Sequence, residues 1–159
     1  MRMIDRLLGS SLNLRTQSGE TTPSGSAAGE KTDTLNGRED EMPSTSIADT
    51  TKISGFIGAC LVDGDSGLML ASEGGGRLDM NMVAALNTDF VKAKQNAIDE
   101  LGLNQGIEDI LITLEKQIHL IRPLDRNRAM FIYVALDKST ANLGMARIQL
   151  KNIEANLKL

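Results

Sequence analysis

The sequence of 159 residues has little of what catalysis and nucleic-acid binding usually require. It contains one cysteine, one histidine and no tryptophan, and aromatic residues make up 3% of the chain. A single cysteine excludes an internal disulfide and fits a reducing compartment, so we expect a cytoplasmic protein. Scarce aromatics and the lack of a basic block argue against nucleic acid as a partner. No apolar run approaches the roughly 20 residues that cross a bilayer, and the amino terminus lacks the apolar core of a signal peptide.

Composition divides the chain into a polar tail, residues 1–46, and a folded domain, residues 47–159. The first 50 residues carry five Lys/Arg against eight Asp/Glu and are rich in Ser, Thr and Gly, whereas the remainder carries twelve against thirteen. We predict a disordered tail because this segment has almost nothing to bury. Met1–Leu14 has a weak helical pattern, for which three interpretations stay open: a short surface anchor, a docking helix for a partner, or the start of the disordered tail.

Hydrophobic periodicity predicts an α+β domain with a five-stranded antiparallel sheet. Phe56–Val62 and Leu68–Ser72 are short apolar runs separated by Asp and Gly, which predicts a β-hairpin. Ser44–Thr51 is expected to add one or two helical turns before it. The other predicted elements are a helix over 79–103, strands over 107–114, 117–123 and 129–136, and a helix over 140–159. The element order is therefore β-β-α-β-β-β-α.

Two of these elements have distinctive patterns. The 129–136 strand is apolar on both faces and is expected at the centre of the sheet. In the last helix one narrow stripe is apolar (Leu143, Ala146, Leu150, Ile153, Leu157), and the remaining positions are expected to face outward (Arg147, Gln149, Lys151, Asn152, Glu154).

The helix over 79–103 carries more apolar surface than one core requires. Asp79 is its expected N-cap, and Gly102 closes its last turn. One apolar stripe consists of Val83, Leu86, Phe90, Ala93, Ala97 and Leu101, and a neighbouring stripe consists of Met80, Ala84, Val91 and Ile98. Together they span about 180°, whereas a helix that covers its own sheet needs roughly 100°. A second cover is needed, either from this chain or, as we favour, from a second copy of it.

No group of residues in the sequence has the pattern of a catalytic or metal site. His119 lies within an alternating strand and has no partner ligands, and Cys60 has no neighbouring cation to activate it. Asp63 and Asp65 begin like a calcium loop, but a glycine occupies the position of its bidentate acid. Gly74–Gly76 precedes a helix without a phosphate-binding signature. We therefore expect a protein that is not an enzyme and uses no cofactor.

Several short motifs in the domain resemble the roadblock/dynein light chain family, in particular its small bacterial members. They are Gly-Ala-Cys-Leu-Val-Asp at 58–63 with Gly-Leu at 67–68, Ile-Arg-Pro-Leu at 121–124, and Asn-Leu-Gly-Met-Ala-Arg at 142–147. None is catalytic, and their order and spacing together carry the resemblance. It implies a homodimer whose long helices lie side by side and whose sheets join edge to edge. It also implies a platform for Ras-like small GTPases or an adaptor role in larger assemblies.

On this resemblance, the dimer contact is expected to include Met80, Ala84, Asn87, Val91, Lys94 and Ile98 on the helix and Ile110 and Ile112 on an edge strand. The leading hypothesis is a non-catalytic dimer that binds a bacterial Ras-like GTPase and changes its nucleotide cycle or location. Stimulation of hydrolysis would act by positioning the GTPase's own residues or through an inserted arginine, for which Arg77, Arg122, Arg126 and Arg128 are the candidates. The alternatives are a scaffold without GTPase involvement in a signalling or motility complex and, third, a small-molecule sensor.

Overall fold

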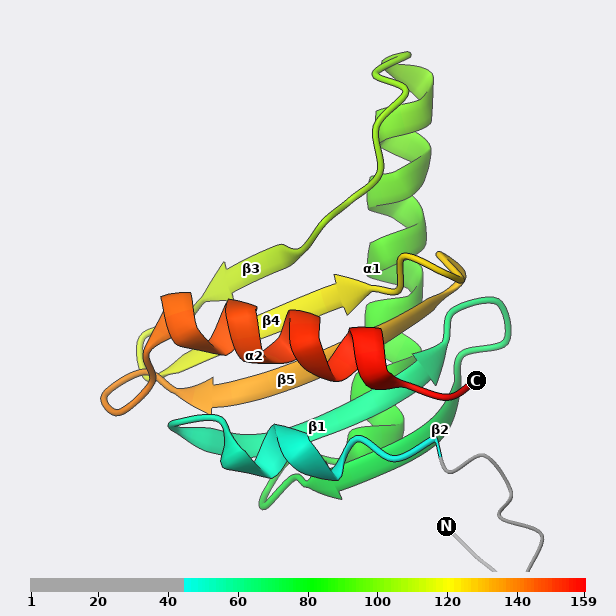
Figure 1. Ribbon diagram of the computed structural model, residues 1–159. Helices are drawn as coiled ribbons and strands as arrows, with labels where there is room; N and C mark the ends of the chain where they lie inside the picture. The colour runs from blue at the N-terminus through cyan, green and yellow to red at the C-terminus, as the bar shows by residue number, and fades with distance from the viewer. Residues whose placement is uncertain (1–44) are drawn as a thin grey trace, which may run out of the picture. The chain divides into compact units, whose positions relative to one another are not determined.

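The computed structural model describes residues 45–159, so the predicted tail up to residue 44, including Met1–Leu14, lies outside the described residues. The elements follow the predicted order, preceded by a short 3-10 helix (Figure 1). They are η1 (Ala48–Lys52), β1 (Phe56–Asp63), β2 (Leu68–Gly74), α1 (Met80–Glu100), β3 (Ile110–Thr113), β4 (Gln117–Pro123), β5 (Met130–Asp137) and α2 (Leu143–Asn156).

The five strands form one antiparallel sheet in the order β2-β1-β5-β4-β3. Strand β5 lies at its centre, and all seven residues from Met130 to Leu136 are buried. This confirms the prediction from the apolar character of both its faces. A strand in the middle of a sheet that is covered on both sides has no solvent-facing position for polar residues.

Each face of the sheet has its own hydrophobic core. On one face, α2 and η1 pack against the strands around Leu61, Leu120 and Ile132, and on the other face α1 packs around Val62 and Phe131. Figure 1 shows the two helices on opposite sides of the sheet. The short η1 helix, flanked by the buried Ile47 and Ile53, helps to close the α2 side.

Helix α1 begins where the sequence predicts. The Asp79 carboxylate accepts hydrogen bonds from the backbone N–H groups of Asn81 and Met82, at 3.0 and 3.2 Å, and so satisfies two of the free donors of the first turn. Just past the helix, Gly102 has a φ of +63°, a conformation that favours glycine. With 21 residues the helix is about 31 Å long, and its C-terminal part extends beyond the sheet (Figure 1).

Strand β3 is shorter than predicted, because only Ile110–Thr113 of the expected 107–114 pairs with β4. The register pairs Ile110 with Ile121, so Glu108 would face Pro123, which has no N–H to donate. Instead of continuing the ladder, Asp109 forms an ion pair with Arg147 of α2 at 2.8 Å.

Helix α2 follows its predicted stripe with one exception. Ala146, Leu150 and Leu157 are buried, and Leu143 and Ile153 pack against the same core. The prediction that Glu154 faces outward is wrong. Its side chain is buried and forms an ion pair of 2.8 Å with Arg122 of β4, which is also buried.

Candidate interaction surface

The buried side of α1 differs from the one that the sequence analysis assigned to the molecule's own core. Met80, Ala84 and Val91 pack against β1, β4 and β5 of their own subunit, together with Thr88. These first three residues were expected at a contact with a second copy. Most of the surface of these residues is already packed within the subunit, so the stripe that is exposed is the other one.

The other stripe forms the exposed side of α1. We call this stripe, which consists of Val83, Leu86, Phe90, Ala93, Ala97 and Leu101, the α1 apolar flank. The exposed fractions of Leu86, Phe90 and Leu101 are 64%, 43% and 71%. Val83 and Ala97 are half-buried. Single exposed apolar residues are common on protein surfaces, whereas several in a row along one helix form a patch of the kind found at interaction sites.

A groove runs beside this flank, between α1 and the segment that leads into β3. It has a volume of about 570 Å³, and Phe90, Lys94, Ile98, Ile110 and Leu111 are among the residues that line it. The structure thus brings together Lys94, Ile98 and Ile110, three of the five remaining residues predicted for the dimer contact. The groove also joins the flank to β3, the edge strand of the sheet.

The remaining two predicted contact residues border the same surface. Asn87 is half-buried beside the flank, where its side-chain amide donates to the backbone carbonyl of Val83 at 2.7 Å. Ile112 is half-buried on β3, the strand at one end of the sheet, whose outer edge has no partner among the described strands. An unpaired strand edge presents free N–H and C=O groups that suit pairing with another chain.

The side chains that could act as a nucleophile or a base are packed into the fold. Cys60 is fully buried, and burial raises the pKa of its thiol to about 12. His119 is half-buried, contacts the Tyr133 ring edge-on and lies 3.0 Å from the side-chain oxygen of Gln117. Burial lowers the pKa of His119, and it raises that of Tyr133 to about 12. All three shifts favour the uncharged form of the group.

The Asp-rich hairpin forms a turn. The Asp63 carboxylate accepts hydrogen bonds from the Asp65 backbone N–H at 3.0 Å and the Ser66 hydroxyl at 2.6 Å, and these bonds lower its pKa. Within residues 45–159, no three His, Cys, Asp or Glu side chains gather closely enough to hold a metal ion. In the same part of the chain no helix is both long and apolar enough to cross a membrane.

The four candidate arginines differ sharply in accessibility. Arg122 is 3% exposed and engaged by Glu154, so it has no free guanidinium to insert into a partner. Arg77, Arg126 and Arg128 are exposed on loops. The Arg122–Glu154 pair is the feature that sequence reasoning missed. No local pattern signals it, because its members are 32 residues apart and belong to two elements whose contact only the fold creates.

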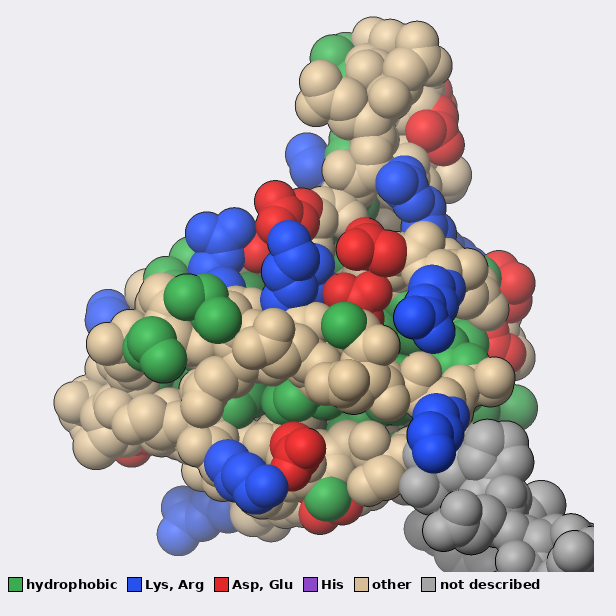
Figure 2. Space-filling model, in the orientation of Figure 1, with side chains coloured by type: hydrophobic (Ala, Val, Ile, Leu, Met, Phe, Trp, Pro, Cys, Tyr) green, Lys and Arg blue, Asp and Glu red, His purple; other side chains and the backbone are tan. Residues whose placement is uncertain are grey.

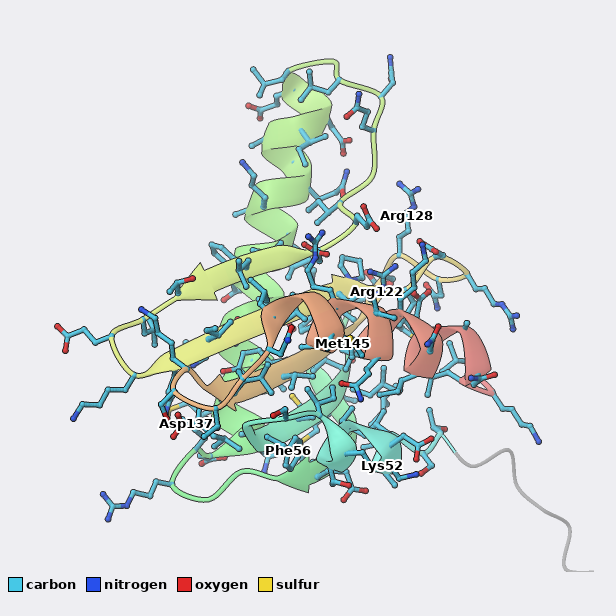
Figure 3. All side chains as sticks on the ribbon, turned by 60° about the vertical axis from the view of Figure 1, so that its left-hand side comes forward. Lys52, Phe56, Arg122, Arg128, Asp137 and Met145 are labelled. Carbon is cyan, nitrogen blue, oxygen red and sulfur yellow. The ribbon has the colours of Figure 1, made fainter. Side chains whose placement is uncertain are left out.

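The face that carries α2 has a different character. Figure 2 shows Lys, Arg, Asp and Glu side chains interspersed across it. Exposed apolar residues there include Met145 and Ile148, on the outer side of α2. Met145 is labelled in Figure 3. The mixed charges make this face an ordinary solvated surface, in contrast to the flank of α1.

No protein-family model matches this sequence, and no curated protein matches it. Solved structures share its fold at low sequence identity. MglB of Myxococcus xanthus is 20% identical with a TM-score of 0.59, over 67% of this chain and 77% of MglB. A roadblock/LC7 domain from Streptomyces avermitilis is 14% identical with a TM-score of 0.58, over 67% and 86%. The gliding protein MglB of Thermus thermophilus is 18% identical with a TM-score of 0.56, over 67% and 78%. This chain is therefore a protein of the roadblock fold.

Proposed function

We propose that the protein is a non-catalytic homodimer that binds a Ras-like small GTPase of a bacterium and modulates its nucleotide cycle or location. The observation that carries the proposal is the α1 apolar flank, in which the described chain leaves Leu86, Phe90 and Leu101 exposed. The resemblance to roadblock proteins supplies the arrangement, in which two long helices lie side by side and two sheets join at an edge. One MglB structure of the same fold is described as having a tetrameric arrangement, which supports self-association.

In the proposed dimer the α1 apolar flank of one copy packs on that of the other. Asn87, Lys94 and Ile98 border the contact, and Ile110 and Ile112 extend it along the open β3 edge. A second copy is favoured over an unrelated occupant because flank and edge adjoin on one side of the domain. A two-fold axis there would cover both at once.

The dimer is tested by measuring the mass of the purified chain by light scattering during gel filtration. The chain has a mass of 17.1 kDa, so a dimer has twice that mass, about 34 kDa. Fully burying a phenylalanine contributes about 1.5–3 kcal/mol, and Phe90 has 43% of its surface left to bury, so each copy gains roughly 1 kcal/mol from this side chain. Phe90→Glu forfeits this contribution and also buries charge, so we expect a monomer that retains the circular dichroism spectrum of the wild type.

Ala85→Glu is the matched control. Ala85 is exposed on the same helix, about 140° around the axis from Phe90, and its variant should remain dimeric. The proposal fails if the wild type is a monomer at tens of micromolar, or if Phe90→Glu leaves the mass of the dimer unchanged.

GTPase binding is tested with the small GTPase encoded nearest to this chain in its genome. We expect the immobilised dimer to retain that GTPase in one nucleotide state, GTP or GDP, in preference to the other. If the dimer retains the GTP-bound and GDP-bound GTPase equally, or retains neither, a role in the nucleotide cycle is contradicted.

Single-turnover GTP hydrolysis then tests the mechanism. If the dimer positions the GTPase's own residues, glutamine variants of Arg77, Arg126 and Arg128 keep the stimulated rate within about twofold. An inserted arginine would instead produce a loss on the order of 10³-fold in one of them.

A further inference from the structure

A second cavity lies on the side of α1 away from the α1 apolar flank. It has a volume of about 370 Å³ and is bounded by α1, the β1–β2 turn, the β4–β5 loop and the segment after α1. Lys92 lines it and lies about 160° around the helix from Phe90. Most of the cavity lining therefore faces away from the proposed dimer contact, although Ile107 lines both the cavity and the groove beside the flank.

Backbone contacts hold the walls of this cavity in place. The Gly64 N–H donates to the Ala129 carbonyl at 2.7 Å, which joins the β1–β2 turn to the β4–β5 loop. A side chain at Gly64 would collide with the same carbonyl. On the α1 side, the Lys92 ammonium donates to the Asp65 carbonyl at 3.0 Å. These contacts link three elements that are distant in the sequence, so the cavity is formed before any ligand arrives.

Arg128 provides a cationic group at the cavity. Its guanidinium lies against the backbone at Gly106, so closely that any side chain at that position would overlap it. Figure 3 shows the side chain rising from the β4–β5 loop toward the segment after α1. Among the described residues it has no ion pair and no hydrogen bond with another side chain. A guanidinium presents several N–H donors in a planar fork, which suits a carboxylate or a phosphate.

The remaining lining matches a ligand with an apolar body. Val91, Pro123 and Ile107 contribute apolar surface, and the ionisable side chains are Arg128 and Lys92 against the single carboxylate of Asp65. The uncharged polar side chains in the lining are Thr88, Gln95 and Asn96. The volume lies at the lower end of the range for small-molecule sites, about 300–1,000 Å³. We propose that this cavity binds a small amphiphilic anion, with its carboxylate or phosphate on Arg128 and its apolar part against Val91 and Pro123.

The test is an NMR titration of the full ¹⁵N-labelled chain with four probes. Hexanoate and hexyl phosphate carry both parts of the proposed ligand, hexanol carries only the apolar part, and inorganic phosphate only the charge. We expect saturable shifts of the Gly64 and Gly106 amides with hexanoate or hexyl phosphate, at an affinity at least tenfold above that for hexanol and inorganic phosphate. The tighter of the two amphiphiles identifies the head group.

Arg128→Gln should weaken that binding at least tenfold, while the rest of the amide spectrum stays in place. Arg126→Gln is the matched control, because Arg126 is an exposed arginine of the same loop that does not line the cavity. The proposal is overturned if neither amphiphile shifts these amides saturably, if hexanol binds equally well, or if both arginine variants weaken binding to the same extent.

Discussion

Replacing Glu154 with glutamine should strongly destabilise the domain. The Glu154 carboxylate holds two donors at once: the Arg122 guanidinium at 2.8 Å and the Asp125 backbone N–H at 2.7 Å. Arg122 is 3% exposed, so little water reaches it to replace the lost partner. Removing one member of a buried ion pair costs about 3–5 kcal/mol, because the other charge is left buried and uncompensated.

The geometry explains why even this nearly isosteric change is costly. If the glutamine oxygen keeps the bond from Asp125, its amide nitrogen faces the Arg122 Nε, and two donors then meet. The ion pair of Arg147 with Asp109 has the same length, but the Arg147 side chain is 49% exposed. Exposed pairs contribute about 0–1 kcal/mol. Asp109 is 12% exposed, but water reaches its partner Arg147, so Asp109→Asn should cost about 1 kcal/mol, well below the cost of Glu154→Gln.

Equilibrium unfolding in urea measures both variants, at equal protein concentration because self-association stabilises the folded state. A loss of about 3 kcal/mol lowers the midpoint by about 1 M or more. The double variant Arg122→Met/Glu154→Leu should recover most of the loss, since it removes both charges. The reasoning is refuted if Glu154→Gln lies within about 1 kcal/mol of the wild type, or if it costs no more than Asp109→Asn.

Three further predictions concern single residues of the domain. The buried thiol of Cys60, with its pKa of about 12, should resist alkylation at pH 8 until urea unfolds the chain, and native-state labelling at the rate of a free thiol would contradict its burial. Gly64→Ala should lower the free energy of unfolding by several kcal/mol, because the new Cβ would meet the Ala129 carbonyl. Gly144→Ala, on an exposed turn of α2, should be neutral or stabilise by about 0.5–1 kcal/mol. Calorimetry of both variants decides this. Burial lowers the pKa of His119 below its usual 6.5, so the unfolded chain binds the proton more readily and stability should fall as the pH drops through 6.5. His119→Gln should remove that part of the pH dependence. Identical profiles of stability against pH for wild type and variant would refute this prediction.

Much of the fold follows from local patterns. The N-cap at Asp79, the burial of both faces of β5 and the inner stripe of α2 all agree with the sequence prediction. Each depends on a periodicity or a cap that a few neighbouring residues carry by themselves. The end of β4 at Pro123 belongs to the same class, since proline lacks a donor wherever it lies.

The features that escaped prediction depend on contacts between distant elements. The sequence shows that α1 has two apolar stripes, but it does not show which one packs on the sheet. The buried stripe consists of Met80, Ala84, Thr88 and Val91, while Leu86 and Phe90 stay outside. That choice is a matter of shape between helix and sheet, which periodicity does not encode.

The sequence alone determined the order of the elements, the centre of the sheet and the excess of apolar surface on one long helix. These properties are written in composition and spacing, because burial selects apolar residues at the period of each element. Only the tertiary structure decided which flank of α1 stays exposed, that Arg122 and Glu154 meet in the interior, and that Lys92 and Arg128 line one cavity. Those residues are far apart in the chain, and their proximity arises only when the sheet and its two helices pack together.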